Sequence, residues 1–139
     1  MKDILTIGLP SKGRLRESAL NFLKKNNLEL ASKGGDRDYF ASLNKLPNAK
    51  VIYLHAREII ERLGDGTLDM GISGLDLLNE STINLQKRIE ILKKLDFGKA
   101  NLVVAVPNDW IDVQTVADLE EVSFHFRDKK NLRLRVATK

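Results

Sequence analysis

Short apolar segments alternate with segments of helical period along this chain. Residues 4–9 are β-branched or apolar at nearly every position, which is typical of a strand buried on both faces. Residues 12–26 place Leu15, Ala19, Phe22 and Leu23 on one helical face. The same reasoning predicts strands at 50–54, 68–72, 89–95, 102–106 and 134–137, and helices at 56–63, 75–79 and 112–119. This alternation predicts an α/β fold whose mostly parallel sheet carries helices on both faces.

Three segments between these elements are less regular. Residues 28–31 are predicted as a short strand, and most of 32–48 as loop, because it contains Gly34-Gly35, Pro47 and several Asn and Asp residues. Gly64 is expected at the C′ position after the helix at 56–63. For 120–134 a strand and a helix–loop both remain open.

Composition and charge narrow the class of protein. The 139 residues are enough for a real core, and 42% hydrophobic with 30% charged residues describes a soluble globular protein. No apolar run approaches the roughly 20 residues of a membrane span, and no signal-peptide pattern opens the chain. Cysteine is absent, which excludes disulfides, thiolate metal sites and a cysteine nucleophile. We expect a cytoplasmic protein with no membrane partner.

The net charge of +4 is unevenly distributed. Residues 127–139 hold six basic residues against Asp128 alone, so the rest of the chain is nearly neutral. Because a duplex partner would favour a basic stripe spread along one face, no nucleic acid is expected. His55 and His125 lie far apart without cysteine, so they make a poor metal site. Neither belongs to a Ser-His-Asp pattern.

The turn between the first predicted strand and helix carries candidate chemistry. Pro10 ends the strand, Ser11 is placed to be the N-cap, and Lys12, Gly13 and Arg14 follow as the first helical residues. Backbone N–H groups at a helix start have no intrahelical partner, and together with two cations they favour an anion. An ordinary turn with solvated basic residues remains the alternative.

A second turn, at 69–76, is equipped in the same way. Gly71 and Gly74 allow close backbone approach, Ser73 lies at the strand end, and Asp76 lies in the first turn of the next helix. Ligands in such sheets bind beyond the carboxyl ends of the strands. The alternative makes Asp76 a helix-dipole residue and both glycines packing requirements.

Five blocks in order carry a family resemblance: Leu9–Leu15, Gly35–Tyr39, Asp69–Asp76, Leu95–Pro107 and Arg135–Lys139. Together they resemble the N-terminal part of the catalytic subunit of ATP phosphoribosyltransferase, in its short form. Residues 120–134 resemble the longer connection of some short-form members. The resemblance implies a type II periplasmic-binding-protein-like fold, with a first domain at 1–90 and an incomplete second domain at 91–139.

The activity implied by the resemblance is the condensation of ATP with phosphoribosyl pyrophosphate, with Mg²⁺, as the first step of histidine biosynthesis. It also implies a hetero-oligomer with a regulatory subunit resembling histidyl-tRNA synthetase. No residue is assigned to covalent catalysis, because holding two polyanions in line is the main requirement. The expected substrate-binding residues are Lys12, Gly13, Arg14, Leu15, Arg37, Ser73, Gly74 and Asp76.

The sequence departs from the family pattern at its end. The Thr-Gly-x-Thr loop that holds the 5-phosphoribosyl group in the family lies beyond the block that ends here at Lys139. We therefore expect an inactive fragment of the enzyme. The alternative is a non-catalytic module that binds a small ligand in a periplasmic-receptor-like fold.

Overall fold

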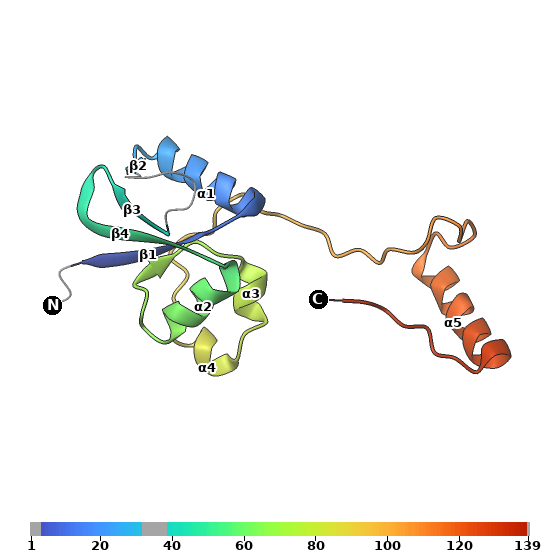
Figure 1. Ribbon diagram of the computed structural model, residues 1–139. Helices are drawn as coiled ribbons and strands as arrows, with labels where there is room; N and C mark the ends of the chain where they lie inside the picture. The colour runs from blue at the N-terminus through green and yellow to red at the C-terminus, as the bar shows by residue number, and fades with distance from the viewer. Residues whose placement is uncertain (1–3, 32–38, 139) are drawn as a thin grey trace. The chain divides into compact units, whose positions relative to one another are not determined.

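The computed structural model describes residues 4–31 and 39–138 (Figure 1). The chain divides into two compact units, the first ending at Ala100 and the second beginning at Asn101. The predicted domains at 1–90 and 91–139 remain a prediction. None of the helices in the described ranges is long and apolar enough to cross a membrane.

A mixed sheet forms the centre of the first unit. In the described residues its strands are β1 (Leu5–Pro10), β2 (Leu30–Ala31), β3 (Phe40–Leu43), β4 (Leu46–Leu54) and β5 (Met70–Gly71), in the order β2-β3-β4-β1-β5. β1 is central and runs parallel to both neighbours, with Leu9 opposite Tyr53 of β4 and Gly8 opposite Gly71 of β5. β3 pairs antiparallel with β2 and β4.

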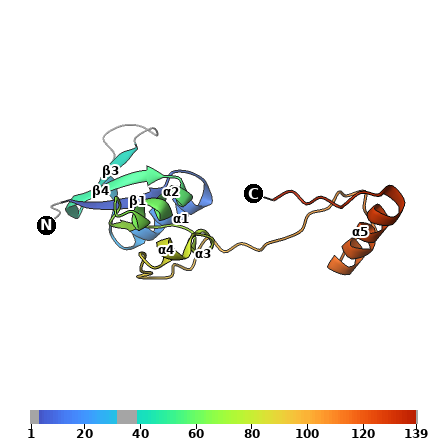
Figure 2. The same ribbon diagram turned by 90° about the horizontal axis from the view of Figure 1, so that it is seen from below.

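Helices cover both faces of this sheet, as predicted. Their bounds are Gly13–Lys25 for α1, Ala56–Gly64 for α2, Leu75–Asn79 for α3 and Ile83–Gln86 for α4. Figures 1 and 2 show α1 on one side of the sheet and α2, α3 and α4 on the other. The α/β class and the parallel pairing of β1, β4 and β5 are therefore confirmed.

The core lies mainly on the α1 face of the sheet. Leu9 of β1 and Val51 of β4 are almost completely buried. Ile7, Ala41, Leu43 and Ala49 complete this cluster, and Leu20 and Leu23 of α1 pack against it. Because β1 and β4 alternate their side chains between the two faces, the residues between these positions point toward α2.

Close approach of α2 to the sheet explains two glycines. A Cβ atom on Gly8 would lie 2.7 Å from Leu68 Cδ1, and one on Gly71 would lie 2.6 Å from Ile59 Cγ2. Ile59 itself is fully buried. The glycines opposite each other on β1 and β5 thus make the space that the Ile59 side chain fills.

Residues 40–48 form a hairpin where mostly loop was predicted. β3 and the first half of β4 occupy this region, with a turn at Asn44-Lys45 and an irregular pairing at Ser42 and Leu43. The Asn44 side chain reaches back to accept a hydrogen bond from the Glu29 backbone N–H at 3.1 Å. The loop prediction was wrong because Pro47 and Asn48 are tolerated here within a strand that continues for six further residues.

The strands predicted at 89–95, 102–106 and 134–137 are also wrong. All three segments are irregular, and their side chains are largely exposed, including Leu92, Leu102 and Val103. Apolar periodicity creates strand propensity, but a strand also needs a neighbour that pairs with its backbone. No described strand pairs with these segments.

The C-terminal end of α2 also differs from its prediction. Gly64 is the last helical residue and not the C′ residue, and Gly66 instead takes the left-handed backbone conformation, with φ of +81°. A Cβ on Gly64 would lie 2.6 Å from Leu85 Cγ, so close packing against α4 explains this glycine.

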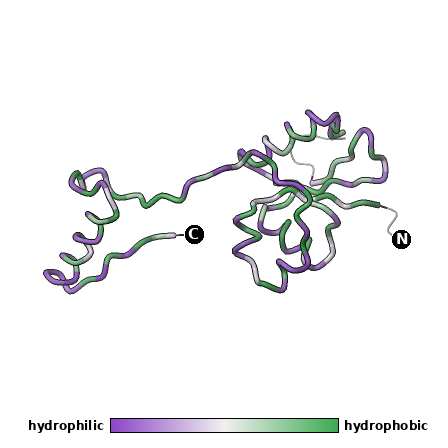
Figure 3. The backbone as a smooth tube through the Cα atoms, turned by 180° about the vertical axis from the view of Figure 1, so that it is seen from behind, coloured by the Kyte–Doolittle hydropathy of each residue, from purple (hydrophilic) through white to green (hydrophobic). Residues whose placement is uncertain are grey.

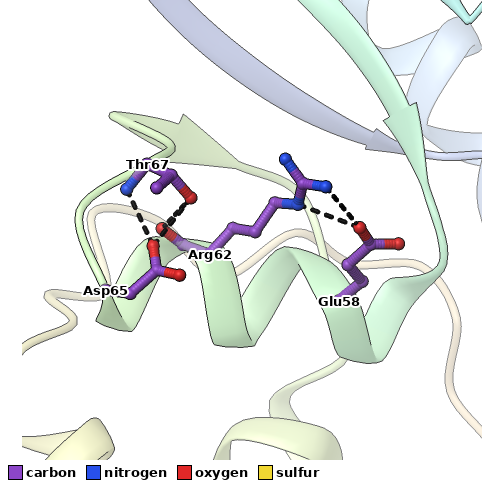
Figure 4. A network of polar contacts seen from close by, with 4 residues as sticks. All are labelled: Glu58, Arg62, Asp65 and Thr67. Atoms are coloured by element: carbon purple, nitrogen blue, oxygen red, sulfur yellow. Dashed lines mark hydrogen bonds and ion pairs between the residues drawn. The ribbon is translucent and has the colours of Figure 1, made fainter.

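Two short polar contacts finish this helix (Figure 4). Arg62 Nε donates to Glu58 Oε1 at 2.9 Å, one helical turn away. The Thr67 hydroxyl and backbone N–H both donate to Asp65 Oδ1, at 2.7 and 2.8 Å. These bonds, the hydroxyl's first, hold the pKa of Asp65 below its usual value. The turn into β5 is therefore shaped by local hydrogen bonds.

The second unit contains one helix within its described residues, α5 (Val116–Lys130). It begins later and runs much further than the helix predicted at 112–119, and it answers the open question over 120–130 in favour of helix. None of its residues is buried. Figure 3 accordingly shows polar and apolar positions mixed along it. A tilted contact between Trp110 and Phe126, with ring centroids 6.1 Å apart, holds the preceding loop against it.

A capping box fixes the start of α5. The Thr115 hydroxyl donates to Asp118 Oδ2 at 2.7 Å, and the same carboxylate accepts from the Thr115 backbone N–H at 2.7 Å and the Gln114 N–H at 3.0 Å. The hydroxyl bond first, and then the two backbone bonds, lower the pKa of Asp118. Asp118 thus serves the helix start as a carboxylate.

We expect the helicity of α5 to depend on pH through Asp118. A lowered pKa means that ionised Asp118 stabilises the helix above about pH 4, and that this contribution is lost as the pH falls through the lowered pKa. Far-ultraviolet circular dichroism between pH 6 and pH 2 should show a loss of helix that Asp118→Asn reduces. Asp128→Asn, near the other end of α5, is the matched control and should leave the response unchanged.

Candidate functional site

The candidate site lies where three parallel strands end together. β1 and β4 finish in register, with Pro10 opposite Leu54, and the Ser11 backbone N–H donates to the Leu54 carbonyl at 2.8 Å. On the other side of β1, the Ile72 N–H donates to the Gly8 carbonyl at 3.0 Å. The turns after β1 and β5 therefore emerge at one edge of the sheet from neighbouring strands, which is the usual ligand edge of such a fold.

The first turn leaves the start of α1 open. The N-cap is Lys12, not Ser11 as predicted, and no side chain caps the helix. Ser11 cannot serve because its backbone bond to Leu54 keeps it with the strands, one residue before the cap. The first N–H groups of α1 thus lack a side-chain acceptor, and Lys12 and Arg14 are both exposed beside them. This arrangement can receive an anion.

Gly13 and Leu15 have local roles in this turn. Gly13 has φ of +75°, in the left-handed region, although a Cβ there would meet nothing within 4 Å. Backbone conformation, rather than space, therefore requires glycine at this position. Leu15 is half-buried, and its Cδ1 would lie 3.4 Å from a Cβ placed on Gly98. Leu15 thus contributes packing behind the turn.

The second turn is tied to the start of α2. The Ser73 hydroxyl donates to the Ala56 carbonyl at 2.7 Å, so its hydrogen is used within the protein. Gly74 is the N-cap of α3, and a Cβ there would overlap Asp76 Oδ1. The exposed Asp76 carboxylate therefore folds back over its own helix start, and glycine makes room for it.

The structure brings six of the expected residues, Lys12, Gly13, Arg14, Ser73, Gly74 and Asp76, to the two turns at this edge. Arg37 lies outside the described residues. His55 is the exposed N-cap residue of α2. No group of three or more His, Cys, Asp or Glu side chains in the described ranges could hold a metal ion.

Arg16 was not among the residues expected at this edge. Its guanidinium carbon lies 4.9 Å from the centroid of the Tyr53 ring, and its Nε atom is buried without a hydrogen-bond partner. Tyr53 is the penultimate residue of β4. The sequence offered no sign of this contact, because the two residues lie far apart in the chain and Arg16 falls outside the apolar stripe of its helix.

Comparison with known proteins adds independent information. Residues 55–139 match the family model of ATP phosphoribosyltransferase (HisG). The whole chain is 46% identical to an ATP phosphoribosyltransferase of Nitrobacter winogradskyi and 45% identical to one of Rhodopseudomonas palustris, and it covers 43% of each of those proteins. A Mesorhizobium japonicum ATP phosphoribosyltransferase is 44% identical over 98% of the chain, which covers 59% of that protein.

Proposed function

Because the chain belongs to the ATP phosphoribosyltransferase family, we propose that it provides a phosphate-binding part of this enzyme. The reaction is the condensation of ATP with phosphoribosyl pyrophosphate to phosphoribosyl-ATP and pyrophosphate. The chain spans only 43% of the length of two of these relatives, so the activity is proposed for an enzyme that contains this chain. The observation that carries the proposal is the uncapped start of α1 between Lys12 and Arg14.

The two turns have different tasks in this proposal. Attack by the adenine ring on the anomeric carbon needs both substrates held in line, with positive charge near the departing pyrophosphate. Lys12, Arg14 and the N–H groups of α1 supply positive charge and donors, and Arg14 offers a planar fork to phosphate. Asp76 is exposed and can accept from a ribose hydroxyl, whereas Gly74 leaves the backbone accessible. Arg37 is proposed as a further cation.

Mg²⁺ is proposed to arrive with the substrates. The described side chains form no cluster that would hold the ion alone, and Mg²⁺ commonly binds substrate phosphates while keeping several waters. The Asp76 carboxylate suits contact with one of those waters. The ion would supply charge neutralisation on the phosphates, and the protein would orient them.

The setting of the enzyme follows from the same resemblance. We propose a cytoplasmic enzyme of histidine biosynthesis that works in a hetero-oligomer with a regulatory subunit resembling histidyl-tRNA synthetase. The resemblance to the short form of the family supports this partner. Co-purification of this chain with such a subunit from a common expression host would test it.

Isothermal titration of the 139-residue chain with ATP tests the proposed site. We expect binding that Arg14→Ala weakens about tenfold, because a hydrogen bond to a charged group contributes about 1.5–3 kcal/mol. Arg14→Lys should recover only part of the affinity, since lysine lacks the planar fork. Lys25→Ala, at the opposite end of α1, removes the same charge and should change the affinity less than twofold.

Three results would contradict the proposal. They are no ATP binding by the wild-type chain, equal weakening by Lys25→Ala, and unchanged binding in Arg14→Ala. Binding of amino acids or simple oxyanions in place of nucleotide would instead support a receptor-like binding module.

A further inference from the structure

Arg16 is held in an unusual environment for an arginine of a surface helix. Its side chain is half-buried between α1 and β4, and the guanidinium lies over the Tyr53 ring at 4.9 Å. The Nε atom is inaccessible to solvent and donates no hydrogen bond. Within the described ranges, Arg57 and Arg62 pair with Glu80 and Glu58. Arg16 pairs with no described carboxylate.

This arrangement has an energetic cost. Arginine remains protonated in proteins, so burial cannot remove its charge. A buried donor left without an acceptor costs about 1–3 kcal/mol, and more when the group is charged. The cation–π contact returns only about 0.5–2 kcal/mol. An orphaned donor of this kind in a folded protein calls for an explanation, and a bound acceptor is one that the position suggests.

The position of Arg16 connects it to the candidate site. Tyr53 stands opposite Leu9 in the β1–β4 pair, one residue before Leu54, whose carbonyl receives the Ser11 N–H. The Arg16–Tyr53 pair therefore lies at the sheet edge from which the β1–α1 turn emerges. Lys12 and Arg14 begin the same helix.

Arg14 and Arg16 cannot serve one oxygen atom from the same side. Two positions along an α-helix are separated by about 200° around its axis. Arg16 faces the sheet over Tyr53, whereas Arg14 is exposed. Two cations on different sides of one helix start suit a ligand that extends across it, with more than one phosphate.

We propose that Arg16 is a further phosphate-binding residue at this edge, positioned by the Tyr53 ring, and that it selects ligands with two or more linked phosphates. This inference rests on the proposed function, because it assumes that the start of α1 receives a phosphate. It adds a residue and a preference: pyrophosphate over phosphate, and ATP over AMP.

The test compares inorganic pyrophosphate with inorganic phosphate by isothermal titration. Arg16→Met keeps the length and apolar contact of the side chain but removes its charge and donors. It should weaken pyrophosphate binding about tenfold and phosphate binding less than twofold. Arg16→Lys should fall between Arg16→Met and the wild type. Arg62→Met removes a half-exposed arginine elsewhere and is the matched control, expected to change neither affinity.

Two further variants test the positioning role of Tyr53. Tyr53→Phe keeps the ring and should retain pyrophosphate affinity, whereas Tyr53→Leu should weaken it severalfold. A purely structural role for Arg16 predicts a lower Tm in Arg16→Met. The proposed role predicts a Tm that is unchanged or higher, because the orphaned donor is removed.

A direct measurement guards against a variant that does not fold. The Nε–Hε signal of Arg16 in the ¹⁵N spectrum of the wild-type chain should shift during titration with pyrophosphate. No shift at saturation, or Arg16→Met with wild-type preference for pyrophosphate, would overturn the inference while leaving the effect of Arg14→Ala on ATP binding intact. A wild-type chain that binds neither ATP nor pyrophosphate would overturn both proposals.

Discussion

Replacement of Ile59 by alanine is expected to lower the free energy of unfolding by about 2–5 kcal/mol. Ile59 is fully buried beneath the sheet, and its methyl groups occupy the space above Gly8 and Gly71. The neighbouring backbone positions carry no side chain that could relax into the vacated volume. Urea denaturation followed by circular dichroism would measure the loss, and Ile83→Ala, at an exposed position of α4, should cost little.

A double-mutant cycle identifies the cause of this loss. Gly71→Ala alone should destabilise the chain by about 1–3 kcal/mol, because its new Cβ would lie 2.6 Å from Ile59 Cγ2. With alanine at position 59 that overlap is gone, so Gly71→Ala should then cost much less. Strictly additive losses would show that Ile59 and Gly71 do not share this space.

Removal of the Asp69 carboxylate is expected to be the second most damaging change, with a loss of about 1–3 kcal/mol. Its Oδ2 atom accepts hydrogen bonds from the Thr6 backbone N–H at 2.7 Å and from the Thr6 hydroxyl at 2.6 Å. The Asp69 N–H in turn donates to the Thr6 carbonyl at 3.1 Å. These bonds connect the residue before β5 to β1, although β5 itself has only two residues.

Thermal and urea unfolding of Asp69→Ala would measure this effect, with Asp69→Asn as the near-isosteric comparison. Asparagine keeps one carbonyl oxygen and should recover part of the stability. Thr6→Val removes the hydroxyl bond but leaves the backbone bond, so it should cost less than Asp69→Ala. If Thr6→Val and Asp69→Ala were additive, the carboxylate would act through groups other than the Thr6 hydroxyl.

The elements that could be predicted from the sequence are those whose burial is periodic. β1 is apolar at successive positions, and the one-sided pattern of α2 places Ile59 and Ile60 toward the sheet. The hairpin of β3 and β4 was missed because Asn44, Pro47 and Asn48 favour turns locally, whereas pairing with β1 decides the outcome. The irregular segment 102–106 shows the converse case, since strand propensity there finds no described partner.

The candidate site divides along the same line. Both turns were predictable, because glycine, serine and charged residues directly follow apolar strands. The identity of the N-cap was not, since a backbone bond between Ser11 and Leu54 decides it. Arg16 was out of reach for the same reason: its environment depends on Tyr53, which only the parallel register of β1 and β4 brings beside the helix.

The exposed segment 102–106 also affects how the purified protein should behave. Leu102 is wholly exposed and Val103 and Val104 are mostly so, in a run that contains no charge before Pro107. Uncharged β-branched runs of this kind template stacking between molecules. Turbidity should therefore rise with concentration on storage, and a lysine in place of Val103 should extend the shelf life of the preparation.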